Sequence, residues 1–135
     1  MRILIVDDDE PFREFIASVL RVRYPRINVR CASDGMEALK ITSEENIPDL
    51  VLTDIIMPRL GGTSLCHSLK EVYHGSVKVV GMSAGLRPSD PVFETVLSKP
   101  FNLDALYKII DDTLRTIETQ GDNIIRGDED TPDKT

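Results

Sequence analysis

The chain has 135 residues, of which 41% are hydrophobic and 29% are charged, and its formal net charge is −7 at pH 7. This length suits one domain with its own core, and the negative charge argues against nucleic acid or an acidic membrane surface as a direct partner. No apolar run approaches the length of a membrane span, and the first residues lack the pattern of a signal peptide, so we expect a cytoplasmic protein. Two cysteines, Cys31 and Cys66, are too few for a disulfide framework, and we predict that both are reduced core residues.

Five short apolar runs predict five buried strands, at residues 2–6, 28–32, 50–54, 77–82 and 95–98. Segments with apolar residues at helical spacing lie between most of these runs, and another follows the last. Strands that alternate with helices are typical of a parallel sheet covered on both faces. We therefore predict an α/β fold with a doubly wound, five-stranded parallel sheet.

Two predicted helices carry specific local signals. Asp34, followed three residues later by Glu37, has the pattern of a capping box and predicts the start of the second helix. In the third helix, the spacing of three apolar residues predicts an inner face formed by Leu65, Leu69 and Val72.

The connection between the fourth and fifth predicted strands is short. It covers about residues 85–94, near the minimum of ~10–12 residues for a strand–helix–strand crossover. Pro88 and Pro91 each remove a backbone donor, and no apolar stripe at helical spacing runs through the segment. We therefore predict that the fourth helix is shortened or absent, and that Val92 and Phe93 turn inward.

The end of the chain differs in composition from the rest. From Gln120 onward acidic residues outnumber basic ones, and no aromatic residue occurs. Such a composition is typical of a solvated, mobile tail. We therefore predict one domain over residues 1–119 and an acidic tail over residues 120–135, with no output domain in the chain.

Polar residues lie at the ends of four of the predicted strands. Asp7 and Asp8 end the first, Asp54 the third, Ser83 the fourth and Lys99 the fifth. The carboxyl ends of parallel strands meet at one sheet edge, where open α/β folds place their sites. Three carboxylates there cannot all ionise cheaply without a cation, and their hard oxygen atoms suit Mg²⁺. With the ammonium of Lys99 the charges balance, so the site could receive a phosphoryl group on Asp54 as the nucleophile.

Each of these residues has an ordinary explanation when it is taken alone. Asp54 would cap the next helix, Ser83 would belong to a turn, and Lys99 would be a solvated surface charge. Asp9 and Glu10 are interpreted as surface charges that stabilise the start of a helix. The functional interpretation rests on five such groups occurring together at strand ends.

These motifs resemble the receiver domain of bacterial two-component response regulators, over about residues 2–118. The shared motifs are Asp7-Asp8 after the first strand, Asp54 followed by Met57-Pro58 and Gly62, Ser83-Ala84 after the fourth strand, and Lys99-Pro100-Phe101 after the fifth. The resemblance implies a flavodoxin-like sheet with the strand order 2-1-3-4-5.

The resemblance also implies a phosphorylation-activated signalling switch. Asp54 would accept a phosphoryl group from a sensor histidine kinase or a phosphotransfer protein, and an unidentified protein would be the downstream target. Lys99 would pair with the phosphoryl oxygen atoms, and Ser83 would donate a hydrogen bond to one of them. Such a protein is no enzyme beyond assisting its own phosphorylation and dephosphorylation.

A magnesium ion is the cofactor that the resemblance implies. Asp8 would bind it directly and Asp7 mainly through water. Asp54 and the backbone carbonyl of Ile56 would be the remaining protein ligands.

Other functions stay open on the sequence. The chain could be a phosphorelay intermediate, or the receiver part of a larger regulator or hybrid kinase. An aspartate-nucleophile phosphatase would need a second carboxylate two residues after Asp54, where Ile56 stands. A flavin or dinucleotide binder would need a glycine-rich or hydroxyl-rich loop after the first strand, where the acidic residues 7–9 would repel phosphate.

Two departures from the family concern the switch and its lifetime. Where some family members carry a swinging aromatic ring, three residues before the lysine, this chain has the stiff Val96, so we expect activation through loop movement. Ile56 and Gly85 flank the site without a polar side chain to hold an attacking water. This predicts slow self-dephosphorylation.

Overall fold

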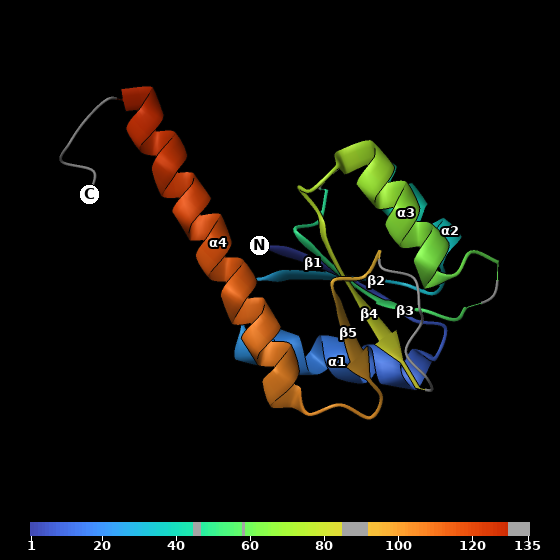
Figure 1. Ribbon diagram of the computed structural model, residues 1–135. Helices are drawn as coiled ribbons and strands as arrows, with labels where there is room; N and C mark the ends of the chain where they lie inside the picture. Colours follow the sequence, from blue (N-terminus) through green and yellow to red (C-terminus); the bar gives the residue numbers. More distant parts are fainter. Residues whose placement is uncertain (45–46, 58, 85–91, 130–135) are drawn as a thin grey trace. The chain divides into compact units, whose positions relative to one another are not determined.

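The computed structural model describes residues 1–44, 47–57, 59–84 and 92–129, and Figure 1 shows its helices and strands. The strands are β1 (Arg2–Val6), β2 (Asn28–Ala32), β3 (Leu50–Asp54), β4 (Lys78–Ser83) and β5 (Thr95–Ser98). The helices are α1 (Glu10–Arg23), α2 (Gly35–Glu44), α3 (Gly62–Tyr73) and α4 (Leu103–Glu129). Of the strands, only β4 departs from its predicted bounds, by one residue.

All five strands lie parallel in one sheet, in the order β2-β1-β3-β4-β5. This confirms the predicted fold class and strand order. Near the carboxyl edge, Val6 of β1 lies opposite Thr53 of β3, and Ser83 of β4 lies opposite Ser98 of β5. The register therefore brings the residues at the ends of β1, β3, β4 and β5 to the same edge of the sheet.

Both faces of the sheet are covered, which explains why its strands read as continuous apolar runs. Leu4 and Val6 of β1 pack in one core cluster with Leu65 and Leu69 of α3. The alternate residue Ile5 is equally inaccessible to solvent, because successive side chains of a strand point to opposite faces. Figure 1 shows α1 on one side of the sheet and α2 with α3 on the other.

The predicted cap of α2 is confirmed, with one change. Asp34 Oδ1 accepts a hydrogen bond from the backbone N–H of Glu37 at 2.9 Å. Glu37 in turn accepts from the backbone N–H of Ser33 at 2.6 Å, one residue before the usual partner in a capping box. At α1, Asp9 Oδ1 accepts from the N–H of Phe12 at 3.3 Å, so Asp9 caps this helix.

Two side chains are more exposed than predicted. Val72 is 62% exposed, because it lies in the last turn of α3 and, with Met36, borders an open groove between α2 and α3. Both cysteines are free thiols, but only Cys66 is buried, whereas Cys31 is partly exposed. Cys31 belongs to β2, which is an edge strand and is therefore less well covered.

The predicted loss of a helix between β4 and β5 falls mainly on residues 85–91, which lie outside the described residues. In the described part of this connection, residues 92–94 form a turn without a helix. Phe93 is buried in the core cluster and Val92 packs against that cluster, so the predicted inward orientation of these two residues is confirmed.

The chain divides into two compact units, one over Met1–Phe101 and a second that begins at Asn102. The second unit contains α4, in which Leu106 is fully buried. α4 continues to Glu129, past Gln120, where the sequence predicts the start of a mobile tail. The predicted border between domain and tail stays a prediction. Over the described residues, no helix combines the length and the apolar character that a membrane crossing needs.

Gly62 provides a test of the packing behind the site. A Cβ atom at Gly62 would collide with the backbone carbonyl of Asp54 and lie 2.8 Å from the Cα atom of Ile55, so the backbone would have to shift. We therefore expect Gly62→Ala to lower the free energy of unfolding, measured in urea, by about 1–3 kcal/mol. Gly75→Ala is the matched control, because nothing lies within 4 Å of a Cβ atom there. Equal stability of the two variants would contradict this packing.

Candidate functional site

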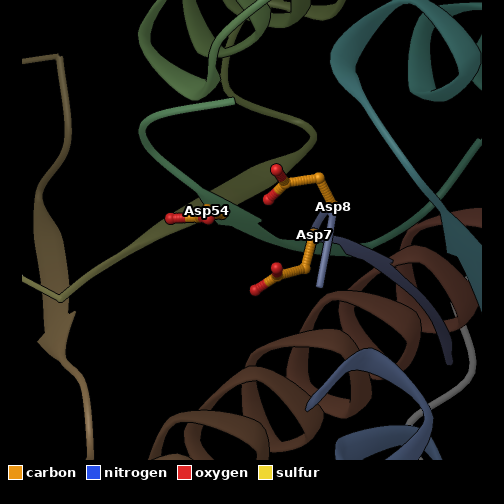
Figure 2. Close-up of side chains that lie close together, drawn as sticks. All are labelled: Asp7, Asp8 and Asp54. Carbon is orange, nitrogen blue, oxygen red and sulfur yellow. The ribbon is translucent and has the colours of Figure 1, made fainter. Parts of the chain in front are cut away.

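Three carboxylates gather at the carboxyl edge of the sheet. Asp7 and Asp8 follow β1, and Asp54 is the last residue of the neighbouring β3. One oxygen atom from each residue lies within 4.8 Å of the other two, and Figure 2 shows the three side chains close together. The structure thus brings together the three acidic residues named from the sequence, because adjacent parallel strands end side by side.

Asp7 is completely buried, yet both oxygen atoms of its carboxylate have partners. Oδ1 accepts a hydrogen bond from the backbone N–H of Asp9 at 2.8 Å, and Oδ2 accepts one from the ammonium of Lys99 at 2.6 Å. The Asp7 backbone carbonyl accepts from the guanidinium of Arg13 at 2.6 Å. A buried carboxylate is tolerated when it is paired and hydrogen-bonded, and these contacts satisfy that condition.

Lys99 reaches the site because the pairing of β4 with β5 continues past the strand ends. Its backbone N–H donates to the carbonyl of Ser83 at 2.7 Å. Its side chain is largely buried, and Nζ lies 3.7 Å from Asp54 Oδ2 as well as 2.6 Å from Asp7 Oδ2. A single ammonium therefore lies between carboxylates from two strands.

Asp54 has a raised pKa. Burial is the largest cause, since it disfavours the charged carboxylate, and the neighbouring Asp7 and Asp8 raise the pKa further. The ammonium of Lys99 acts in the opposite direction but does not outweigh these effects. Three carboxylates gather at this edge beside the one ammonium of Lys99, so the edge favours a further cation.

Ser83 and Ile56 are the other residues named from the sequence. Ser83 ends β4 and is almost completely buried, next to the point where Lys99 begins its approach to the site. Ile56 lies two residues after Asp54, and its side chain is 83% exposed. The proposed use of its backbone carbonyl as a metal ligand stays a prediction.

The loop after β3 is tied to the loop after β2. Arg59 forms an ion pair with the buried Asp34, and the N–H of Gly35 donates to the carbonyl of Leu60 at 3.2 Å. The backbone N–H of Glu37 and then the Arg59 side chain hold the pKa of Asp34 below its usual range. Arg59 has a φ of 65°, in the left-handed region that residues other than glycine rarely adopt.

Sequence reasoning missed two neighbours of the site, Phe12 and Arg13. The Lys99 ammonium lies over the Phe12 ring, 4.3 Å from its centroid, and Arg13 donates to the carbonyl of Asp7. Both residues belong to the first turn of α1, which starts directly after the acidic run. The available signal was this proximity in sequence, but which side chains turn back toward the strand end depends on the tertiary packing.

The donor set fits a magnesium ion. Asp7, Asp8 and Asp54 offer carboxylate oxygen atoms, the hard ligands that Mg²⁺ prefers. Asp8 is exposed, which leaves room for the water molecules that Mg²⁺ usually retains. A divalent cation would also offset the negative charges of Asp7 and Asp8, which add to the effect of burial on the pKa of Asp54.

The raised pKa of Asp54 predicts a dependence of stability on pH. Stability linked to its protonated form is present at acid pH and is lost as the pH rises through the raised pKa. In metal-free buffer at pH 7, Asp54→Asn should therefore unfold at a higher temperature than the wild type, and this gain should shrink as the pH falls through the acid range. Glu71→Gln, at an exposed position of α3, serves as the control. A melting temperature of Asp54→Asn at or below that of the wild type at pH 7 would be the contrary result.

Comparison with known proteins agrees with this geometry. The family model described as "Response regulator receiver domain" matches residues 3–111. Response regulator MprA of Mycobacterium avium (strain 104) is 31% identical over 134 residues, which cover 90% of this chain and 54% of the relative. The chain thus spans about half the length of that relative. Histidine kinase P4 of Formosa agariphila is 44% identical over 69 residues, which cover 51% of this chain and 5% of the kinase.

A solved structure shows the same fold. The response regulator protein TrrA from Thermotoga maritima, in complex with Mg²⁺-BeF, has a TM-score of 0.73 and 28% sequence identity, over 83% of this chain and 97% of the other. The matched family model covers β2 to β5, β1 from its second residue onward, and the three carboxylates. The chain therefore belongs to the family of response regulator receiver domains of two-component systems.

Proposed function

We propose that Asp54 accepts a phosphoryl group from a histidine kinase or a phosphotransfer protein in a Mg²⁺-dependent reaction, and that the aspartyl phosphate switches the surface of the domain. One observation carries this proposal: the carboxylate of Asp54 lies at the sheet edge, with Lys99 Nζ 3.7 Å away and the oxygen atoms of Asp7 and Asp8 within 4.8 Å. A nucleophile, a cation and a set of metal ligands thus meet at one place.

The transfer asks little covalent chemistry of the protein. A carboxylate oxygen of Asp54 forms a bond to phosphorus while the bond from phosphorus to the donor breaks, and the protein supplies position and charge. Lys99 pairs with the phosphoryl oxygen atoms, and the hydroxyl of Ser83 donates a hydrogen bond to one of them. Both residues already lie at the ends of β5 and β4 beside Asp54.

Asp7, Asp8, Asp54 and the backbone carbonyl of Ile56 would hold the magnesium ion. When bound, Mg²⁺ supplies positive charge that offsets the carboxylates and the incoming phosphoryl oxygen atoms. The proximity of the three carboxylates supports this assignment, because one oxygen atom from each lies within 4.8 Å of the other two.

The phosphoryl group would add about −1.5 to −2 charge at Asp54 and new hydrogen-bond acceptors. Lys99 now contacts Asp7 more closely than Asp54, so a phosphoryl group on Asp54 would compete for this ammonium. Because Val96 on β5 offers no swinging ring, the loops after β4 and β5 would carry the signal. Receiver domains of this kind are switches rather than general enzymes.

A second arrangement is supported by the similarity to part of Histidine kinase P4 of Formosa agariphila. The receiver would then belong to a larger regulator or a hybrid kinase, or would pass the phosphoryl group along a relay. The chemistry at Asp54 is the same in each case, and only the acceptor of the signal differs.

The acceptor can be tested directly. After incubation with Mg²⁺ and acetyl phosphate, intact-protein mass spectrometry should show one added phosphoryl group. Asp54→Asn should abolish the addition, and so should removal of the metal with a chelator, because the nucleophile or the charge compensation is then missing. Asp104→Asn, at an exposed position of α4, is the matched control. Undiminished labelling of Asp54→Asn would move the acceptor elsewhere.

The lifetime of the phosphoryl group is a separate prediction. With an apolar, exposed Ile56 beside the site, no side chain at this position holds an attacking water, so we expect slow self-dephosphorylation. Ile56→Asn or Ile56→Glu should speed phosphate loss at least about tenfold, because a positioned water is then available. Val22→Asn is the control, since Val22 on α1 is 82% exposed, against 83% for Ile56. An unchanged rate in both Ile56 variants would reject the explanation.

A further inference from the structure

The ammonium of Lys99 has an uncharged partner besides its two carboxylates. Nζ lies over the face of the Phe12 ring, 4.3 Å from the centroid. A cation within about 6 Å of a ring face is attracted by the negative potential there, and the attraction grows when water is excluded. The Lys99 side chain is only 15% exposed, so this contact is largely desolvated.

The Phe12 ring is held in place from two directions. The backbone N–H of Phe12 donates to Asp9, the N-cap of α1, which fixes the first turn of the helix against the end of β1. The rings of Phe12 and Phe101 pack perpendicular to each other, with centroids 6.0 Å apart. Phe101 lies two residues after Lys99. The Phe12 ring therefore contacts two residues of the segment that follows β5, Lys99 and Phe101.

The ring and the carboxylates respond differently to a divalent cation. A cation bound by Asp7, Asp8 and Asp54 would use the oxygen atoms that now attract Lys99, and its own charge would repel the ammonium. The aromatic face takes no part in that competition. It offers Lys99 a binding position that stays available when the carboxylates are neutralised.

We propose that Phe12 is a positioning residue that retains the Lys99 ammonium at the sheet edge when Mg²⁺ neutralises the carboxylates. Its role in phosphoryl transfer rests on the proposed function, because Lys99 must remain at the site to pair with the phosphoryl oxygen atoms. Phe12 itself touches no reacting atom and acts through Lys99.

Nuclear magnetic resonance measures the retention without any reaction. In protein carrying ¹³C- and ¹⁵N-labelled lysine, the Hε signals of Lys99 should be shifted upfield by the ring and should keep most of this shift in MgCl₂. Lys99→Arg identifies the signals by their absence. In Phe12→Leu, which keeps an apolar side chain, the shift should vanish. An Hε shift that is the same in Phe12→Leu, or that disappears on adding MgCl₂ to the wild type, overturns the proposal.

A fluorination series separates the electrostatic role of the ring from its packing. Site-specific incorporation of mono-, di- and trifluorophenylalanine at position 12 withdraws charge from the ring face with little change in shape. The rate of labelling by acetyl phosphate should fall stepwise, by about three- to tenfold across the series, while the melting temperature stays nearly constant. The same series at Phe15, an exposed position of α1, should leave the rate unchanged.

The two measurements distinguish the possible failures. If the wild type cannot be labelled, the proposed function fails, and the lysine spectra still decide whether Phe12 retains the ammonium. If labelling proceeds at the same rate across the fluorination series at position 12, the ring does not act through its electrostatic potential, and the proposal fails while the proposed function stands.

Discussion

The buried ion pair between Asp7 and Lys99 is the interaction on which the geometry of the site depends. Asp7 follows β1 and Lys99 follows β5, and two strands, β3 and β4, lie between them in the sheet. The pair therefore connects the ends of strands that are not neighbours, and Lys99 Nζ lies 3.7 Å from Asp54 Oδ2. Removing one partner from a buried pair costs proteins about 3–5 kcal/mol, because the other charge is left uncompensated. Asp7 and Lys99 therefore depend on each other, and their pairing sets the position of the only ammonium near Asp54 among the described residues.

The features that follow from chain direction could be predicted from the sequence. Parallel strands that are buried on both faces are visible as continuous apolar runs. Their ends meet at one edge of the sheet, so the positions of Asp7, Asp54 and Lys99 in the sequence predict that the three lie there. The cap of α2 could also be predicted, because Asp34 and Glu37 are only three residues apart in the sequence. The helix cap and the positions of the strand ends both depend on residues close together in the sequence, so both could be predicted.

Features that depend on how distant elements pack could not be predicted. Val72 has the right helical spacing for burial and is nevertheless exposed, because α2 leaves an open groove beside the end of α3. Phe12 and Lys99 are far apart in the sequence, and no pattern in either segment predicts their contact. The ion pair of Arg59 with Asp34 likewise depends on two loops meeting. Each of these features depends on how distant segments pack, which the hydrophobic periodicity of a single segment does not predict.

The tie between Arg59 and Asp34 affects how a signal can spread from the site. A residue at a φ of 65° persists only where its surroundings hold it there, and here the buried carboxylate does so. The ion pair and the hydrogen bond from Gly35 to Leu60 thus join the described part of the loop after β3 to the start of α2. Under the proposed function, a change in charge at Asp54 would therefore reach the β2 flank through Arg59 and Asp34 as well as the β4 and β5 flank through Ser83 and Lys99.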